Sequence, residues 1–189
     1  VLETCHAAFE TETDEAVRGH LLDHYYEINA GIGVHKSPKL YGAFPTDPYS
    51  HTPAGKGAQQ PGMTGQVKED VLSRFGEFGV EVSDGKLGFN PRLLRGNEFL
   101  KESKTFHYIA LPKKKNSILV SKDSLCFTYC QVPITYTISD EESLTVKFSN
   151  GNSTTFKTLS LDAETSAHVF NRTGDVVELN VHVKKSRLK

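Results

Sequence analysis

From about Lys104 to the C-terminus, apolar and polar residues alternate, and this pattern constrains the fold more than any other feature. Period-two alternation places successive side chains on opposite faces of a strand. Turn-forming residues separate the runs at Lys122-Asp123, Asn150-Gly151 and Thr173-Gly174-Asp175. The strand candidates are residues 106–111, 118–121, 125–139, 144–149, 154–161, 167–170 and 176–183. Short strands without helical patterning predict an antiparallel β-sandwich over residues 97–189.

The N-terminal part has helical rather than strand periodicity. Val17, Leu21, Tyr25 and Ile28 recur at helical spacing, which predicts an amphipathic helix over residues 13–30. A second, shorter helix is expected from about residue 64 to 75, with Thr64 as its N-cap. Residues 80–89 then predict a small hairpin, because two period-two segments flank an Asp-Gly turn.

Between the two predicted helices lies a segment rich in glycine and proline. Residues 31–63 hold six of the fifteen glycines and five of the eight prolines, which excludes regular structure there. Tyr41, Phe44 and Tyr49 are poor composition for disorder, so we expect an ordered functional loop. The alternative is a purely structural loop in which Asp47 makes an Asx turn. The expected fold class is therefore α+β, with a helix pair and long ordered loop in residues 1–96 and a predominantly antiparallel β-sandwich in residues 97–189.

The charge balance limits the classes of partner. The chain carries 22 basic and 23 acidic side chains, for a formal net charge of -1. Nucleic acids and anionic membranes require clustered Lys and Arg, so we expect neither as a partner, and a neutral or small ligand instead. No apolar run approaches the ~20 residues that span a bilayer. Cys5, Cys126 and Cys130 lack CxxC spacing and are expected to be reduced; with no signal-peptide pattern, they favour a cytoplasmic location.

The other sequence motifs do not predict a metal site, a phosphate-binding loop or an esterase site. His20 and His24 have the spacing of a zinc pair, but no third ligand is evident, so polar residues on a helix surface explain them better. Gly55-Lys56 lacks the other residues of a phosphate-binding loop, and no GxSxG nucleophile motif is present. We therefore predict no metal and no cofactor.

The long loop and the start of the second helix hold the strongest candidate site. An acid, an imidazole, amides and an aromatic ring in a proline-rich backbone are typical of a site for a polar neutral ligand such as a sugar. Free backbone amides at the helix start suit a phosphate or carboxylate oxygen. The predicted catalytic residues are Asp47 and Glu69. The predicted substrate-binding residues are Tyr49, His51, Gln60, Thr64, Gly65, Gln66 and Lys68.

A family resemblance reaches the same region. Thr64-Gly65, a helix ending in Arg74, the Asp84-Gly85 turn, Phe89-Asn90-Pro91 and a strand-rich tail follow one another. This order resembles the end of inverting sugar phosphorylases of the cellobiose and chitobiose type, and more widely six-hairpin glycosidases with an (α/α)6 barrel. In those proteins a Thr-Gly pair opens a last barrel helix at the phosphate or sugar pocket. The resemblance implies pocket roles for Thr64 and Gly65, and a chain that is the C-terminal part of a longer protein.

Three functional hypotheses follow. The first is the C-terminal region of a carbohydrate-active protein that contributes to hydrolysis or phosphorolysis of a glycosidic bond, with a mono- or oligosaccharide, inorganic phosphate and the upstream part of its own chain as partners. The isolated chain is not expected to be an active enzyme. The second is a noncatalytic carbohydrate-binding or assembly module that uses exposed aromatics among Phe106, Tyr108, Tyr129 and Tyr136. The third is a structural domain that docks against another chain.

Overall fold

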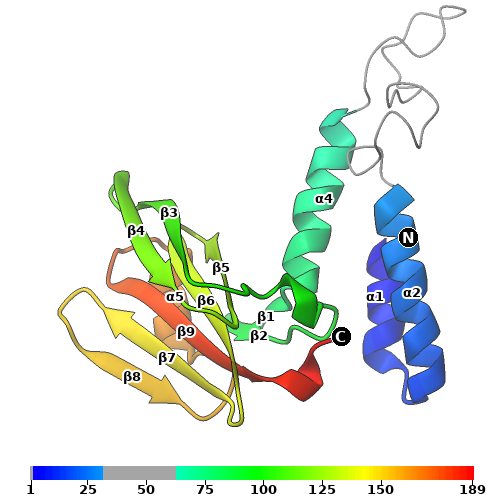
Figure 1. Cartoon of the computed structure of the whole chain (residues 1–189). Helices are drawn as coiled ribbons and strands as arrows, with labels where there is room; N and C mark the ends of the chain where they lie inside the picture. Colours follow the sequence, from blue (N-terminus) through cyan, green and yellow to red (C-terminus); the bar gives the residue numbers. More distant parts are fainter. Residues whose placement is uncertain (1, 32–62) are drawn as a thin grey trace, which may run out of the picture. The chain divides into compact units, whose positions relative to one another are not determined.

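The chain forms two compact units, Val1–Gly76 and Glu77–Lys189. The computed structural model describes residues 2–31 and 63–189 (Figure 1). Helices precede a strand-rich remainder, so the predicted α+β class is confirmed. The domain boundary predicted from composition, between residues 96 and 97, concerns independently folding domains and stays a prediction.

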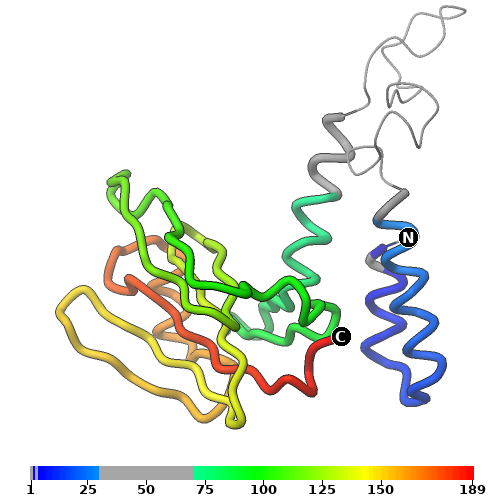
Figure 2. Tube along the Cα trace, in the orientation of Figure 1, coloured from blue at the N-terminus to red at the C-terminus, as the bar shows by residue number. Residues whose placement is uncertain are grey.

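The first unit is helical. Helices α1 (Leu2–Thr11) and α2 (Glu15–Gly31) are joined by a short turn, visible as a reversal of the blue tube in Figure 2. Asp14 Oδ1 accepts bonds from the amides of Ala16 and Val17 at 2.8 and 3.1 Å and so caps α2. Helix α2 confirms the first predicted helix, whereas α1 was not predicted.

The second predicted helix is confirmed as α4 (Met63–Glu77). The predicted hairpin is confirmed as well, because β1 (Val80–Ser83) and β2 (Lys86–Phe89) pair antiparallel. Its two turn residues have positive φ angles of 50° and 71°, which an Asp-Gly pair adopts readily.

The remaining strands form a two-stranded ribbon and a five-stranded sheet. The ribbon consists of β3 (Lys104–Ala110) and β4 (Lys114–Val120). The sheet has the order β5-β6-β9-β7-β8, with β6 and β9 parallel and its other pairs antiparallel. Its strands are β5 (Ser124–Tyr129), β6 (Val132–Ser139), β7 (Ser143–Phe148), β8 (Ser153–Phe156) and β9 (Val176–Lys184). The predicted strand 125–139 is two strands, because Cys130 and Gln131 take positive φ angles and turn the chain.

One predicted strand is wrong. Residues 167–170 belong to a helix, α5 (Ala163–Phe170). Asp162 Oδ1 accepts a bond from the Thr165 amide at 2.7 Å, so an N-cap starts a helix where four apolar-rich residues suggested a strand. Val169 on this helix is fully buried.

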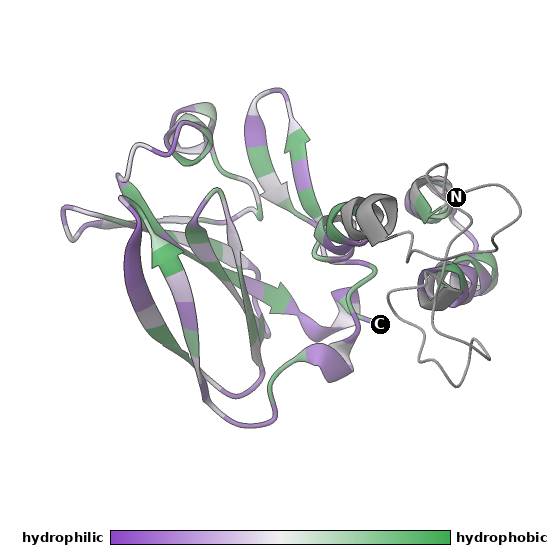
Figure 3. Ribbon diagram, turned by 90° about the horizontal axis from the view of Figure 1, so that it is seen from above, coloured by the Kyte–Doolittle hydropathy of each residue, from purple (hydrophilic) through white to green (hydrophobic). Residues whose placement is uncertain are grey.

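The core of the second unit lies mainly on one face of the five-stranded sheet. Figure 1 shows α5 behind the sheet, and Figure 3 shows the alternation of hydrophilic and hydrophobic residues along the strands. Phe78 stacks on Phe127 with ring centroids 4.1 Å apart, and Tyr136 Oη donates to the Phe78 carbonyl at 2.5 Å. Fully buried members of this apolar face are Ile134, Tyr136, Leu144, Val146, Leu179, Val181 and Val183. The opposite side of the sheet, here called the polar face, carries the alternate residues of the same strands.

Candidate functional site

The predicted loop site falls largely on residues that the structure does not describe. Outside the described residues lie Asp47, Tyr49, His51 and Gln60. In the first turns of α4, where only the backbone is described, lie Thr64, Gly65, Gln66, Lys68 and Glu69. Their proposed grouping into one site therefore stays a prediction.

Within the second unit, a polar cavity of about 380 Å³ opens beside the β1–β2 hairpin. We call it the hairpin pocket. Its lining comes from the hairpin, from the segment that follows β2, from residues 159–160 and from the end of the chain. The polar side chains that face it include Glu81, Lys86, Asn90, Arg92, Ser160 and Arg187.

One residue that lines the hairpin pocket is a glycine, Gly88. Ser160 forms an isolated β-bridge with Gly88, and the Phe89 amide donates to the Leu159 carbonyl at 2.8 Å. Gly88 pairs with Glu81 on one side and with Ser160 on the other. A carboxylate and a hydroxyl therefore flank a position without a side chain. Glycine inside a strand is typical of a place where a ligand or another backbone approaches closely.

A hydrogen-bonded network forms one wall of the hairpin pocket. Arg187, in the short helix η3 (Lys185–Arg187), donates from Nε and Nη2 to the two carboxylate oxygens of Glu142, the latter at 2.9 Å. Its Nη1 donates to Asn90 Oδ1 at 3.2 Å, and Asn90 Nδ2 donates to Glu81 Oε1 at 3.1 Å. Both ends of the Asn90 amide are thus fixed.

The same network sets the electrostatics of the wall. The side-chain hydrogen bonds from Arg187 lower the pKa of Glu142 below its ordinary value. The bonds to Glu142 in turn raise the pKa of Arg187. This pair therefore stays ionised over the neutral range and holds the wall in one arrangement.

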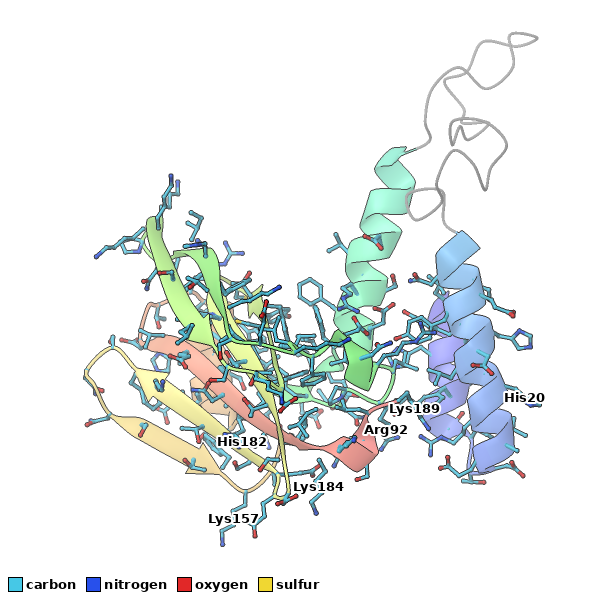
Figure 4. The ribbon with its side chains drawn as sticks, viewed as in Figure 1. His20, Arg92, Lys157, His182, Lys184 and Lys189 are labelled. Carbon is cyan, nitrogen blue, oxygen red and sulfur yellow. The ribbon has the colours of Figure 1, made fainter. Side chains whose placement is uncertain are left out.

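The charges around the hairpin pocket balance. Its lining includes the acids Glu81 and Asp84 and the cations Lys86, Arg92 and Arg187. Glu142 offsets the charge of Arg187, which leaves two acids and two cations. Arg92, labelled in Figure 4, lies just after the hairpin in the chain. A charge-balanced polar cavity suits a neutral ligand with many hydrogen-bonding groups.

A second cavity, of about 180 Å³, lies where the ribbon meets β5. Its lining is mostly apolar and includes Leu100, Phe106, Val120, Leu125 and Cys126. Burial raises the pKa of the Cys126 thiol to about 11, so this cysteine is protonated at neutral pH and is no nucleophile. The three cysteines are free.

The aromatic residues of the second hypothesis separate into two groups. Tyr136 is fully buried in the core and is excluded as a recognition residue. Phe106, Tyr108 and Tyr129 are half-buried. The rings of Phe106 and Tyr108 stack with centroids 6.0 Å apart on one side of the ribbon.

The remaining predictions concern metals and membranes. His20 and His24 are exposed on α2, and His24 Nδ1 lies 3.3 Å from Glu27 of the same helix. Within residues 2–31 and 63–189, no group of three or more His, Cys, Asp or Glu side chains is placed to hold a metal ion. In the same residues, no helix combines the length and the apolar character needed to cross a membrane.

The hairpin pocket is not among the sites that the sequence predicts. The Asp84-Gly85 turn and Asn90 belong to the family resemblance alone. Gly88, an isolated glycine within a strand pattern, was the available local signal. Arg187 had no such signal, because it lies 97 positions from Asn90 in the sequence.

The sequence was also compared with known proteins. No protein-family model and no curated protein matches it. The resemblance to six-hairpin glycosidases therefore stays a prediction.

Proposed function

We propose that the unit Glu77–Lys189 binds carbohydrate without catalysing a reaction, and that the hairpin pocket holds one neutral sugar residue. The observation that carries this proposal is a charge-balanced polar cavity whose wall is fixed by the Arg187–Asn90–Glu81 network. Its volume of about 380 Å³ lies within the range of ligand pockets.

The lining suits the chemistry of a sugar. Sugar hydroxyls both donate and accept hydrogen bonds, so they need partners of both kinds. The Glu81 carboxylate accepts from a hydroxyl, and Lys86 donates to one. Ser160 does both, and Gly88 adds no side chain to the lining. Because the wall is already hydrogen-bonded, little side-chain freedom is lost when the ligand binds.

The arrangement of the elements also supports a carbohydrate ligand. Helix α4, the β1–β2 hairpin and a strand-rich remainder follow one another in the order on which the family resemblance rests. Asp84 and Asn90, which belong to the motifs of that resemblance, line the hairpin pocket.

Titration of the ¹⁵N-labelled full chain with neutral monosaccharides such as glucose, galactose, mannose and N-acetylglucosamine tests the proposal. We expect shifts of the Gly88 amide and of the Asn90 side-chain amide. Gly88→Leu adds a side chain to the lining and should weaken binding at least tenfold. Gly19→Ala is the matched control, because a Cβ atom added there, on α2, meets nothing within 4 Å.

Two outcomes would contradict the proposal. The first is a wild-type spectrum that none of these sugars changes at saturating concentration. The second is binding that survives Gly88→Leu and is abolished by Asp47→Asn, which would move the site to the loop predicted from the sequence.

A further inference from the structure

The polar face of the five-stranded sheet has an unusual composition for a surface in contact with solvent. Strand pairing aligns its side chains in rows that cross the sheet. One row is Cys126, Thr135, Asn180, Thr145 and Thr155. The next is Ser124, Thr137, His182 and Ser143. These two rows hold short hydroxyl, amide, thiol and imidazole groups, whereas long Lys and Glu side chains usually keep a surface soluble. In the neighbouring row of the same face, Lys147 pairs with Glu178.

Hydrogen bonds between strands hold these side chains in place. The hydroxyls of Thr145 and Thr155 lie 2.9 Å apart. Those of Ser124 and Thr137 lie 3.0 Å apart. Within β9, Asn180 Nδ2 also donates to Glu178 Oε1 at 2.8 Å. A surface of short, mutually bonded side chains loses little conformational entropy on binding.

The polar face is open over part of the sheet and covered over the rest. On β5 and β6, Ser124 and Thr135 are 1% and 9% exposed. On β9, the central strand, Asn180 and His182 are half-exposed, and Thr155 on β8 is exposed. Figure 4 labels His182 on this strand. A row across all five strands spans about 19 Å at the usual strand spacing.

The ribbon brings aromatic rings to the border of this face. Tyr108 lines a small cavity together with Val176 and Val177, the first residues of β9, so it lies close to that end of the sheet. Burial, and after it the negative charge of Glu178, raise the pKa of Tyr108. Phe106 stacks beside it with an interplanar angle of 17°, and Asn116 Nδ2 donates to Tyr108 Oη at 3.1 Å. Aromatic rings beside hydroxyl and amide groups are suited to ligands with both apolar and polar surfaces, as sugars have.

The charges on the polar face indicate which class of ligand it binds. On the open part of the polar face, Lys147 Nζ lies 3.0 Å from Glu178 Oε1, so this pair cancels. The rows of Thr, Ser and Asn carry no formal charge. The surface therefore favours a neutral, hydroxyl-rich molecule. Each short side chain contributes only about 0.5–1.5 kcal/mol through a hydrogen bond, so useful affinity requires a ligand that contacts several rows at once.

We infer that the polar face is a second binding surface, which takes an extended neutral polysaccharide chain lying across strands β9, β7 and β8. The inference shares its ligand class with the proposed function and so rests on it. It uses a different part of the same unit, and its ligand is a chain rather than a single sugar.

Binding of cellohexaose, xylohexaose and maltohexaose to the full chain tests the inference. Asn180→Ala combined with His182→Ala should weaken binding of the preferred hexasaccharide at least tenfold and leave monosaccharide binding unchanged. His168→Ala is the matched control, because His168 lies on α5, which packs on the apolar side of the sheet. In the wild type, the hexasaccharide should shift the side-chain amide signal of Asn180.

A second variant covers the case in which the double variant does not fold. Thr155→Lys puts a long charged side chain on the exposed edge strand β8 and should also weaken hexasaccharide binding. Wild-type affinity for the hexasaccharides in either folded variant would overturn the inference, as would loss of that affinity in Gly88→Leu alone. In those cases the proposed function stands. If the wild type binds neither monosaccharides nor hexasaccharides, both proposals are wrong.

Discussion

The two faces of the five-stranded sheet are built from alternate residues of the same strands, yet different interactions hold them together. On β9, Leu179, Val181 and Val183 are fully buried, whereas Asn180 and His182 between them are half-exposed. Burial of an aliphatic side chain stabilises a fold by about 1.5–3 kcal/mol, and a hydrogen bond contributes about 0.5–1.5 kcal/mol net. The apolar face therefore carries most of the stability, which leaves the polar face available for recognition.

The strongest test of this contrast compares the stability of Leu179→Ala with that of Asn180→Ala. Leu179→Ala leaves a cavity in the core and should lower the free energy of unfolding by about 2–5 kcal/mol. Asn180→Ala should lower it by less than about 1 kcal/mol. Urea unfolding followed through NMR signals of the second unit measures both. Equal losses in the two variants would show that the polar face contributes to stability as much as the core.

Tyr136→Phe examines a polar group within the apolar face. Loss of the Tyr136 hydroxyl leaves the Phe78 carbonyl without its buried hydrogen-bond donor and should lower the free energy of unfolding by about 1–3 kcal/mol. Burial also raises the pKa of Tyr136 well above its ordinary value. Because the unfolded chain then ionises first, stability should fall as the pH rises above about 10.

Comparison of the wild type and Tyr136→Phe in urea across that pH range gives the second readout. The wild type should lose stability more steeply, since only it carries this buried phenol. Parallel curves for the two proteins would mean that Tyr136 does not keep its proton in the folded state.

Local sequence patterns predicted most of the helices and strands but not the hairpin pocket. The Asp84-Gly85 turn fixed the hairpin, because its two backbone conformations are rare elsewhere. Helix α5 was missed, since its start depends on one side-chain bond from Asp162 rather than on a long periodic pattern. The wall of the hairpin pocket was missed for a stronger reason. Arg187 and Asn90 meet only when the whole second unit has folded.

Glu142→Gln tests whether the ion pair at the pocket wall contributes as little to the free energy of unfolding as a residue of the polar face, or as much as a residue of the core. The pair is partly exposed, so after solvent screening we expect a loss of only about 0.5–1 kcal/mol. The pKa of Glu142 is lower in the folded chain than in the unfolded chain. The Glu142 carboxylate therefore stabilises the fold at pH values above its pKa in the unfolded chain, and this stabilisation is lost as the pH falls through its pKa in the folded chain. Acid unfolding of the wild type and the variant should therefore converge at low pH. A difference that persists there would contradict the ion-pair explanation.

Gly88→Ala should have the smallest effect on stability. It distinguishes a role of Gly88 in ligand binding from a role in the stability of the fold. A Cβ atom added at Gly88 meets its nearest neighbour, the Leu159 carbonyl oxygen, at 3.7 Å, which is ordinary contact. Since glycine in a strand costs about 0.5–1 kcal/mol relative to alanine, the variant should be as stable as the wild type or slightly more stable. Thermal unfolding measures this, and monosaccharide titration should show weaker binding.

Gly79→Ala is the contrasting control. Gly79 has a φ angle of 67°, and an added Cβ atom would lie 2.0 Å from the backbone of Asn90, so this variant should be strongly destabilised. Two glycines nine positions apart would then have different roles, since Gly79 is required by the path of the backbone and Gly88 by the pocket that it lines. If Gly88→Ala instead destabilises the protein as Gly79→Ala does, Gly88 is required by the fold and its lack of a side chain is no evidence for a ligand.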